Sequence, residues 1–263
     1  MNTSTKMPVL FVGHGSPMNA IENNRFSREW SRLASQIPKP KAILSISAHW
    51  VTDGRFVNNQ ENPKTIYDMY GFPQELYEVV YEPQGVPELA SQVIKLIGDN
   101  VSVDNQWGID HGTWSVLNHM FPAADIPTMQ LSIDANATME EHFQIGRKLQ
   151  SLRTEGVLIL GSGNVVHNLS LVDWGNPDGE PWATEFDQYI KQNILNRNAA
   201  SVIEYKSAGS VANQAFYTTE HYVPLLVALG SSTMEDSIHV FNDECIMGSI
   251  SMTGYLFGET EKK

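Results

Sequence analysis

Histidines hold most of the chemical potential of this sequence, and three of its eight share one setting. His14, His49 and His167 each stand at or just after the end of a short apolar run, at residues 9–12, 42–48 and 156–160. Such runs predict buried strands, and in α/β sheets ligands bind beyond the carboxyl ends of the strands. We therefore expect these imidazoles to converge. Imidazole binds zinc, iron, copper and nickel, so the sequence predicts a metal site.

Two further histidines have neighbours suited to a site. His111 lies between glycine and tryptophan residues, and the adjacent Asp110 is a candidate to fix its tautomer. His221 is expected at a helix start, with Glu220 beside it as an alternative carboxylate ligand. The other three fall within helical or alternating-strand patterns and are interpreted as structural: His119, His142 and His239.

The long intervals between these histidines indicate ligands from separate strands and loops, unlike the compact helical His-Glu-x-x-His motif. The single cysteine, Cys245, excludes a disulfide within the chain and a cysteine-based zinc site. Three protein ligands that leave positions open are typical of a catalytic metal. A nucleotide site is disfavoured, because the glycines at 161 and 163 lack the remaining residues of either phosphate-binding fingerprint. Ser16 is interpreted as a turn residue.

The pattern of strands and helices predicts one α/β domain over residues 1–263. We expect helices at 25–37 (capped by Asn24), 87–97, 138–154, 181–196 and 220–229 (capped by Thr219). Further strands are expected at 101–103, 127–133, around 239 and at 249–257, the last two as an antiparallel flank. Asp53-Gly54 predicts a hairpin that pairs residues 55–58 with the preceding strand. The aromatic loop 59–85 is predicted to be a wall or lid over a pocket.

Composition narrows the possible partners and compartments. The formal net charge is −13 and basic runs are lacking, which argues against nucleic acid or an anionic membrane as a partner. No stretch approaches the roughly 20 apolar residues of a membrane span, and the N-terminal apolar run is too short for a signal peptide. We expect a cytoplasmic protein. The oligomeric state is not legible from the sequence.

Five motifs resemble those of one enzyme family. They are Gly13-His14-Gly15-Ser16-Pro17, Ser47-Ala48-His49-Trp50, Trp107-Gly108-Ile109-Asp110-His111-Gly112-Thr113-Trp114, Gly163-Asn164-Val165-Val166-His167-Asn168 and Glu220-His221-Tyr222-Val223-Pro224. In this order, over residues 7–257, the chain resembles the class III extradiol ring-cleavage dioxygenases, most closely the 4,5-DOPA extradiol dioxygenase type of bacteria and plants.

The resemblance implies a single α/β domain with a central mixed, mostly parallel sheet flanked by helices, and a mononuclear non-haem metal. His14, His49 and His221 match metal-ligand positions. His167 matches a position that acts either as a further ligand or as a catalytic acid or base. His111 matches a histidine that handles protons and substrate oxygens. Glu220 stays open as a substitute for His221, because related enzymes use a glutamate as third ligand.

The leading hypothesis is an Fe(II)-dependent extradiol dioxygenase. It would cleave a DOPA-like catechol at the 4,5 position with O2 to give a muconic semialdehyde, and Zn(II) could occupy the same site. Asn164, Ser162 and Tyr222 are candidates to hold the amino-acid side chain of such a substrate. Two alternatives remain, a zinc enzyme of hydrolytic type and a non-catalytic metal-binding relative. His111, a spare imidazole, favours an enzyme over a binding protein.

Overall fold

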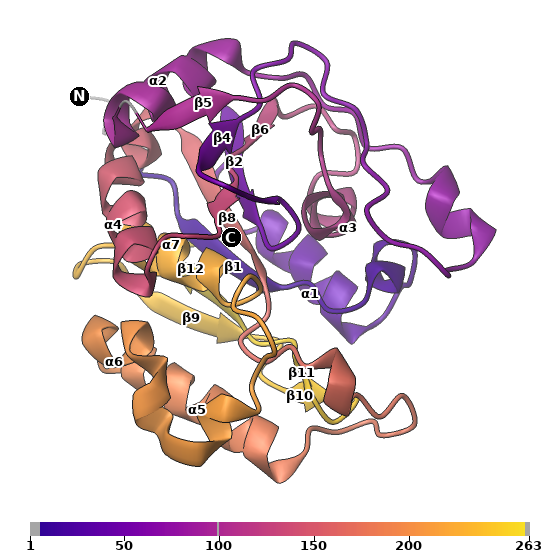
Figure 1. Cartoon of the computed structure of the whole chain (residues 1–263). Coiled ribbons are helices and arrows are strands. Elements are labelled where there is room, and N and C mark those ends of the chain that lie inside the picture. The colour runs from indigo at the N-terminus through magenta and orange to yellow at the C-terminus, as the bar shows by residue number, and fades with distance from the viewer. Residues whose placement is uncertain (1–5, 99, 261–263) are drawn as a thin grey trace.

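A six-stranded sheet forms the centre of the computed structural model, which describes residues 6–98 and 100–260 (Figure 1). The strand order is β6-β2-β8-β1-β12-β9. The first four strands are parallel, and β12 runs antiparallel to both of its neighbours. The predicted mixed, mostly parallel sheet is therefore confirmed, as is the antiparallel C-terminal flank. In this order the strands are Thr128–Gln130, Ala42–Ser47, Val157–Gly163, Val9–Gly13, Gly254–Phe257 and Ile238–Phe241.

Helices cover both faces of the sheet, so its strands are buried on both sides. Along β1, Val9 and Phe11 pack in one apolar cluster, and Leu10 and Val12 pack in the other. Each such side chain contributes roughly 1.5–3 kcal/mol when fully buried. The first cluster packs against α2 (Pro87–Ile97), α4 (Met139–Leu149), α5 (Pro181–Leu195), α6 (Ala199–Ile203) and α7 (Val223–Ser231); the second packs against α1 (Arg25–Ala34) and α3 (His111–Met120).

Side-chain caps fix two of the correctly predicted helix starts, and proline in the first turn marks two others, α2 and α5. The Asn24 side chain accepts hydrogen bonds from the first turn of α1, and Thr138 does the same for α4. The predicted helix over 138–154 is shorter than expected, because a 3-10 segment, Gln150–Glu155, replaces its C-terminal part. The predicted strand over 127–133 is divided into β6 and β7 (Ile133–Asp134).

The glycine-rich residues 161–163 form the end of β8 rather than a turn, which corrects the expected end of this strand at residue 160. A Cβ atom on Gly163 would lie 2.1 Å from the carbonyl oxygen of His221, and one on Gly161 would lie 2.5 Å from that of Pro224. These glycines therefore allow the segment before α7 to approach the sheet closely. That approach brings His221 to the end of β8.

The predicted hairpin at Asp53-Gly54 is wrong. The strands on either side of it, β3 (Val51–Thr52) and β4 (Arg55–Val57), pair with β7 and with β5 (Val101–Val103), both in parallel. The hydroxyl of Ser132 hydrogen-bonds to both β3 and β4. Tertiary pairing thus overrides the local turn signal. The remaining small sheet pairs β10 (Cys245–Ile246) with β11 (Ile250–Ser251).

The last helix begins three residues later than predicted, at Val223. Thr219 accepts hydrogen bonds from the backbone of Tyr222 and Val223 and so closes a turn, rather than capping a helix that starts at residue 220. Pro224 explains the difference, because a proline is tolerated only in the first turn of a helix. His221 consequently lies in an irregular segment and not on the helix.

Candidate active site

The five histidines singled out from the sequence line one cavity of about 490 Å³ at the carboxyl edge of the sheet. His14 follows β1, His49 follows β2 and His167 follows β8. His111 is the first residue of α3, and His221 precedes α7. The convergence expected from the strand ends is therefore present.

Three of these imidazoles form a compact set of nitrogen atoms. The Nε2 atoms of His14 and His49 are 3.1 Å apart, and one ring nitrogen of each of His14, His49 and His221 lies within 4.8 Å of the others. Two nitrogens bound at about 2.1 Å to one ion lie at most about 4.2 Å apart. A small closure of this set would therefore suit a single metal ion.

Each of the three rings has an oxygen partner at its other nitrogen. The Nδ1–H of His14 donates to Ser162 Oγ over 3.0 Å, and that hydroxyl in turn donates to the carbonyl of Gly112. His49 Nδ1 lies 3.3 Å from a carboxylate oxygen of Asp68, and His221 Nδ1 lies 3.3 Å from one of Glu220. Such partners fix the tautomer and orientation of metal-ligating histidines.

Burial keeps these imidazoles neutral. It lowers the pKa of His14, His49 and His221 well below the usual value, and repulsion between neighbouring imidazoles lowers it further. A neutral ring offers a lone pair to a metal. The Nε2 atom of His221 is fully buried and has no hydrogen-bond partner among the described residues, which is costly unless a ligand binds it. The donor set therefore fits a divalent transition metal.

Asp68, not the predicted Asp110, orients His111. Its two carboxylate oxygens accept from the backbone N–H of His111 at 2.9 Å and face the ring Nδ1 at 2.7 Å. Burial alone would raise the pKa of Asp68, but its contacts with His111 and His49 lower it overall. Asp110 instead caps α3 by accepting from the backbone of Thr113. Asp68 therefore belongs to the site.

His167 lies face to face with His221. The ring centroids are 3.5 Å apart and the planes differ by 7°. The pKa of His167 is lowered to about 4 by burial and then by the charge of His111.

The walls of the cavity are mostly apolar. The loop at 59–85 supplies Met69, Tyr70 and Phe72, so the predicted wall is present. The opposite wall comes from the segments after β8 and around β11, with Leu169, Trp174, Met247 and Ile250.

Comparison with known proteins decides the family. The family described as the catalytic LigB subunit of aromatic ring-opening dioxygenase matches residues 5–257. The chain belongs to the LigB family. It is 44% identical to a 4,5-DOPA dioxygenase extradiol of Escherichia coli K12 (97% of this chain, 96% of that protein) and 36% identical to one of Beta vulgaris (95% and 96%). A crystal structure of an uncharacterized E. coli K12 protein matches with a TM-score of 0.84 and 40% identity, covering 96% of this chain and all of that one.

This LigB-family protein is therefore an extradiol aromatic ring-opening dioxygenase, whose reactants are a small aromatic molecule and O2. The resemblance inferred from the five motifs is confirmed. Membership favours a dioxygenase over a zinc hydrolase or a non-catalytic relative. In the described part of the chain, no helix combines the length and apolar character needed to cross a bilayer.

The three residues predicted to hold a substrate side chain in this LigB-family enzyme do not line the cavity. The hydroxyl of Tyr222 donates to the carbonyl of Val202, and the amide of Asn164 donates to that of Ser251. Ser162 holds His14, as described above. All three side chains are fully buried, so they position the fold and the metal site rather than a substrate.

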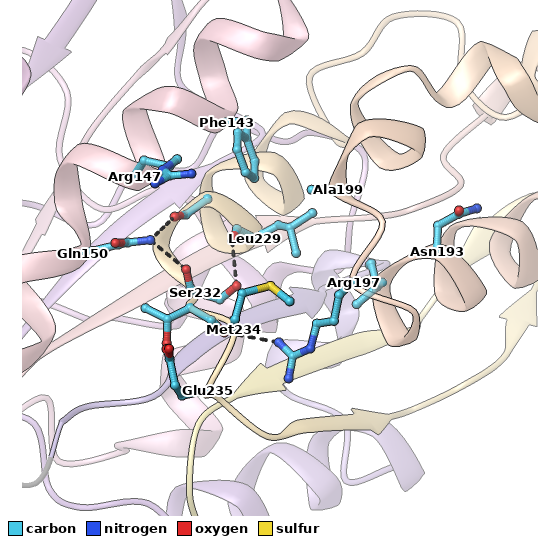
Figure 2. Close-up of a pocket in the computed structure, with 13 residues that line it drawn as sticks. Phe143, Arg147, Gln150, Asn193, Arg197, Ala199, Leu229, Ser232, Met234 and Glu235 are labelled. Atoms are coloured by element: carbon cyan, nitrogen blue, oxygen red, sulfur yellow. Dashed lines mark hydrogen bonds between the residues drawn. The ribbon is translucent and has the colours of Figure 1, made fainter.

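A second cavity, of about 320 Å³, opens beside α4, α5 and α7, and Figure 2 shows its lining. Its polar side chains close the C-terminal end of α7: Gln150 donates to the carbonyls of Gly230 and Ser232, and Arg197 donates to those of Thr233 and Asp236. None of the described residues that line it is a histidine. We therefore interpret it as structural, in contrast to the histidine-lined cavity.

Proposed function

We propose that this enzyme is an Fe(II)-dependent dioxygenase that cleaves a DOPA-like catechol at the 4,5 position, with O2, to a muconic semialdehyde. The observation that carries the proposal is the set of His14, His49 and His221 nitrogens within 4.8 Å of one another, next to the His111 imidazole that Asp68 holds. The names of the E. coli and Beta vulgaris relatives support this choice of substrate. We further propose that the enzyme acts in the cytoplasm.

His14, His49 and His221 would hold the metal through Nε2, with Ser162, Asp68 and Glu220 fixing the three rings. Ferrous iron bound there would supply coordination positions for the catechol oxygens and for O2. Imidazole also suits zinc, which binds such sites more tightly than ferrous iron, so Zn(II) is a competing occupant.

We assign His167 outside the ligand set. The rings of His167 and His221 are parallel and 3.5 Å apart, and this stacking favours His14, His49 and His221 as the residues that would hold the metal. His167 is therefore proposed as an acid–base residue at a substrate oxygen: burial lowers its pKa to about 4, so the neutral ring first accepts a proton from the substrate and then returns it.

His111 is proposed as the base that accepts a catechol proton. Its Nδ1–H donates to the Asp68 carboxylate, so the lone pair on Nε2 is free to accept. The carboxylate then stabilises the imidazolium that forms. General-base assistance of this kind contributes about 10²–10⁴-fold to a rate. The walls that would face the substrate ring are mostly apolar.

The test is oxygen uptake by protein prepared without oxygen and loaded with either Fe(II) or Zn(II). We expect the iron form to consume one O2 per L-DOPA, with the growing absorbance of a semialdehyde, and the zinc form to consume none. For alanine variants of the proposed ligands, His239→Ala is the matched control, because this histidine lies on the exposed side of β9. The proposal fails if the iron form consumes no oxygen with any catechol.

A further inference from the structure

The cavity that holds the five histidines is one-sided in charge. Among the described residues that line it, Glu220 is the only carboxylate and none is a lysine or an arginine. Asp68 adds a second negative charge behind His49 and His111. The whole chain carries a formal net charge of −13. A substrate that brings a carboxylate into this cavity therefore finds no side chain of opposite charge.

The cavity is also larger than a catechol ring, since its 490 Å³ lies within the range of pockets that enclose drug-sized ligands. Two aromatic rings stand at its mouth, where Tyr70 is 92% exposed and Trp174 is 71% exposed. Met69, Leu169 and Met247 also line the cavity. A ring substituent that extends away from the metal would contact these apolar and aromatic side chains.

The sign of the charge on a substituent decides whether the histidine-lined cavity can accept it. A carboxylate that loses water without gaining a partner is strongly disfavoured. An ammonium group gains in two ways, from the Glu220 carboxylate and from the faces of the tyrosine and tryptophan rings. The negative charge of the protein also draws cations toward the cavity.

Glu220 has capacity for this role although it also faces His221. Only its Oε1 atom lies near His221 Nδ1, at 3.3 Å, and no hydrogen bond to Oε2 is formed by the described residues. Its side chain is 27% exposed, so it is neither sealed in the core nor fully in solvent.

We propose that Glu220, with Tyr70 and Trp174, makes the site selective for catechols that carry an amine-bearing side chain and makes it reject those that carry a carboxylate alone. This selectivity rests on the proposed catechol cleavage and specifies its substrate class. Within a DOPA-like molecule, the ammonium group is the element that the site recognises, and the carboxylate is tolerated.

The test compares substrates that share the catechol ring and differ in the charge of a short side chain. These are 2-(3,4-dihydroxyphenyl)ethylamine, 4-ethylcatechol, L-DOPA and 3-(3,4-dihydroxyphenyl)propionate. We expect kcat/KM for the amine to exceed that for the propionate by at least about tenfold, with the other two between them. Anaerobic calorimetry with zinc-loaded protein is expected to give the same order of affinity without turnover.

The matched variants are Glu220→Gln and Glu180→Gln, each of which removes one negative charge. Glu180 is exposed and lies outside the cavity lining. We expect Glu220→Gln to reduce the amine-to-propionate ratio to near one, and Glu180→Gln to leave it unchanged. A role in holding His221 alone would lower turnover of all four catechols equally and leave the ratio intact, which would overturn the proposal.

The failure of this inference differs from the failure of the proposed function. If the iron form turns over the propionate as well as the amine, the selectivity is wrong and the catechol cleavage stands. If no catechol is cleaved, the cleavage is wrong, and the order of affinities measured with the zinc form still decides whether the cavity prefers a cation.

Discussion

Strand β1 has a buried polar cluster at each of its ends, and the two clusters differ in how completely their polar atoms are paired. Before its amino end, the Arg153 guanidinium is fully buried and makes five hydrogen bonds. Its partners are both carboxylate oxygens of Asp236 and the carbonyl oxygens of Met7, Ser231 and Phe257. Beyond the carboxyl end, the histidine cluster leaves His221 Nε2 buried without a partner among the described residues.

This difference separates a structural cluster from a functional one. Around Arg153, every buried charge is compensated within the protein, so the cluster joins the N-terminal segment to the C-terminal strand. Around His14, buried imidazoles repel one another when protonated, and one ring nitrogen of each of His14, His49 and His221 lies within 4.8 Å of the others. Such an arrangement lowers the stability of the metal-free chain. This loss is offset only when a ligand binds to the imidazoles. Substitutions in the two clusters should therefore have opposite consequences for folding and for activity.

The largest effect on activity is expected for His221→Ala. Loss of a proposed ligand should cost more than the about 10–100-fold typical of an outer partner, and metal content should fall with it. The isolated apoprotein should not lose stability in proportion, because an uncompensated buried nitrogen is removed. Metal analysis measures the metal content, oxygen uptake measures the activity, and thermal unfolding measures the stability of the apoprotein. Full iron content in His221→Ala would contradict the assignment and favour Glu220 as the ligand.

Next is His111→Gln, which should separate metal binding from turnover. The variant should keep its iron, because the proposed ligands are His14, His49 and His221, and kcat should fall by about 10²–10⁴-fold with the base removed. Single-turnover measurement with iron-loaded protein checks this. If iron is lost instead, His111 is a ligand and the proposed division of roles is wrong.

At the other cluster, Arg153→Met should destabilise the fold by about 3–5 kcal/mol, because it leaves the buried Asp236 without its main partner. Activity per folded molecule should stay unchanged. The control is Arg25→Met, which breaks an exposed pair with Glu244 and should cost no more than about 1 kcal/mol. Denaturant unfolding of the metal-free proteins compares the two. Equal effects would mean that the Arg153 cluster is not the structural element described above.

A smaller effect on activity is expected for Asp68→Asn. The amide keeps the size of the side chain but removes the charge that faces His49 and His111, so activity should fall by about 10–100-fold, the usual cost of an outer partner. Oxygen uptake at saturating iron measures it. Asp110→Asn is the comparison, because Asp110 caps α3 and lies outside the cavity lining. Loss of the Asp110 carboxylate should lower the free energy of unfolding more than it lowers the turnover of the catechol.

The histidine cluster was largely predictable, because strand ends in a parallel sheet gather at one edge. His14, His49 and His167 needed only short apolar runs to be recognised. Asp68 was missed because it lies in an aperiodic loop and acts on residues far away in the sequence. Its position next to His111 makes Asp110 the apparent partner in the sequence, but helix geometry directs its carboxylate toward the first turn of α3. A capping aspartate before a helix is the signal that could have prevented this error.

Contacts made in three dimensions also explain the remaining errors. Ser162 was expected to touch a substrate, but β8 continues through it and directs its hydroxyl to His14. The Asp53-Gly54 turn carries a hairpin signal, yet the strands around it find better partners in other segments. Neither outcome is encoded in local propensity, because each depends on which distant segment competes for the same hydrogen bonds.

The smallest effect is expected in the pH dependence of the stability that the Arg153 cluster provides. Hydrogen bonds from Arg153 and from the Thr233 backbone outweigh the cost of burial and hold the pKa of Asp236 at about 2, below its usual 3.8. A carboxyl group with a lowered pKa in the folded state contributes stability that is complete above its unfolded pKa and is lost as pH falls through the folded one. The difference in unfolding free energy between the wild type and Asp236→Asn should thus be constant from pH 7 to about 5 and should shrink between pH 4 and pH 2. Chelator-treated protein keeps metal release by the histidines out of the measurement.

A difference that stays constant down to pH 2 would show that Asp236 acts by packing rather than by charge, and the contrast between the two ends of β1 would then lie in shape alone.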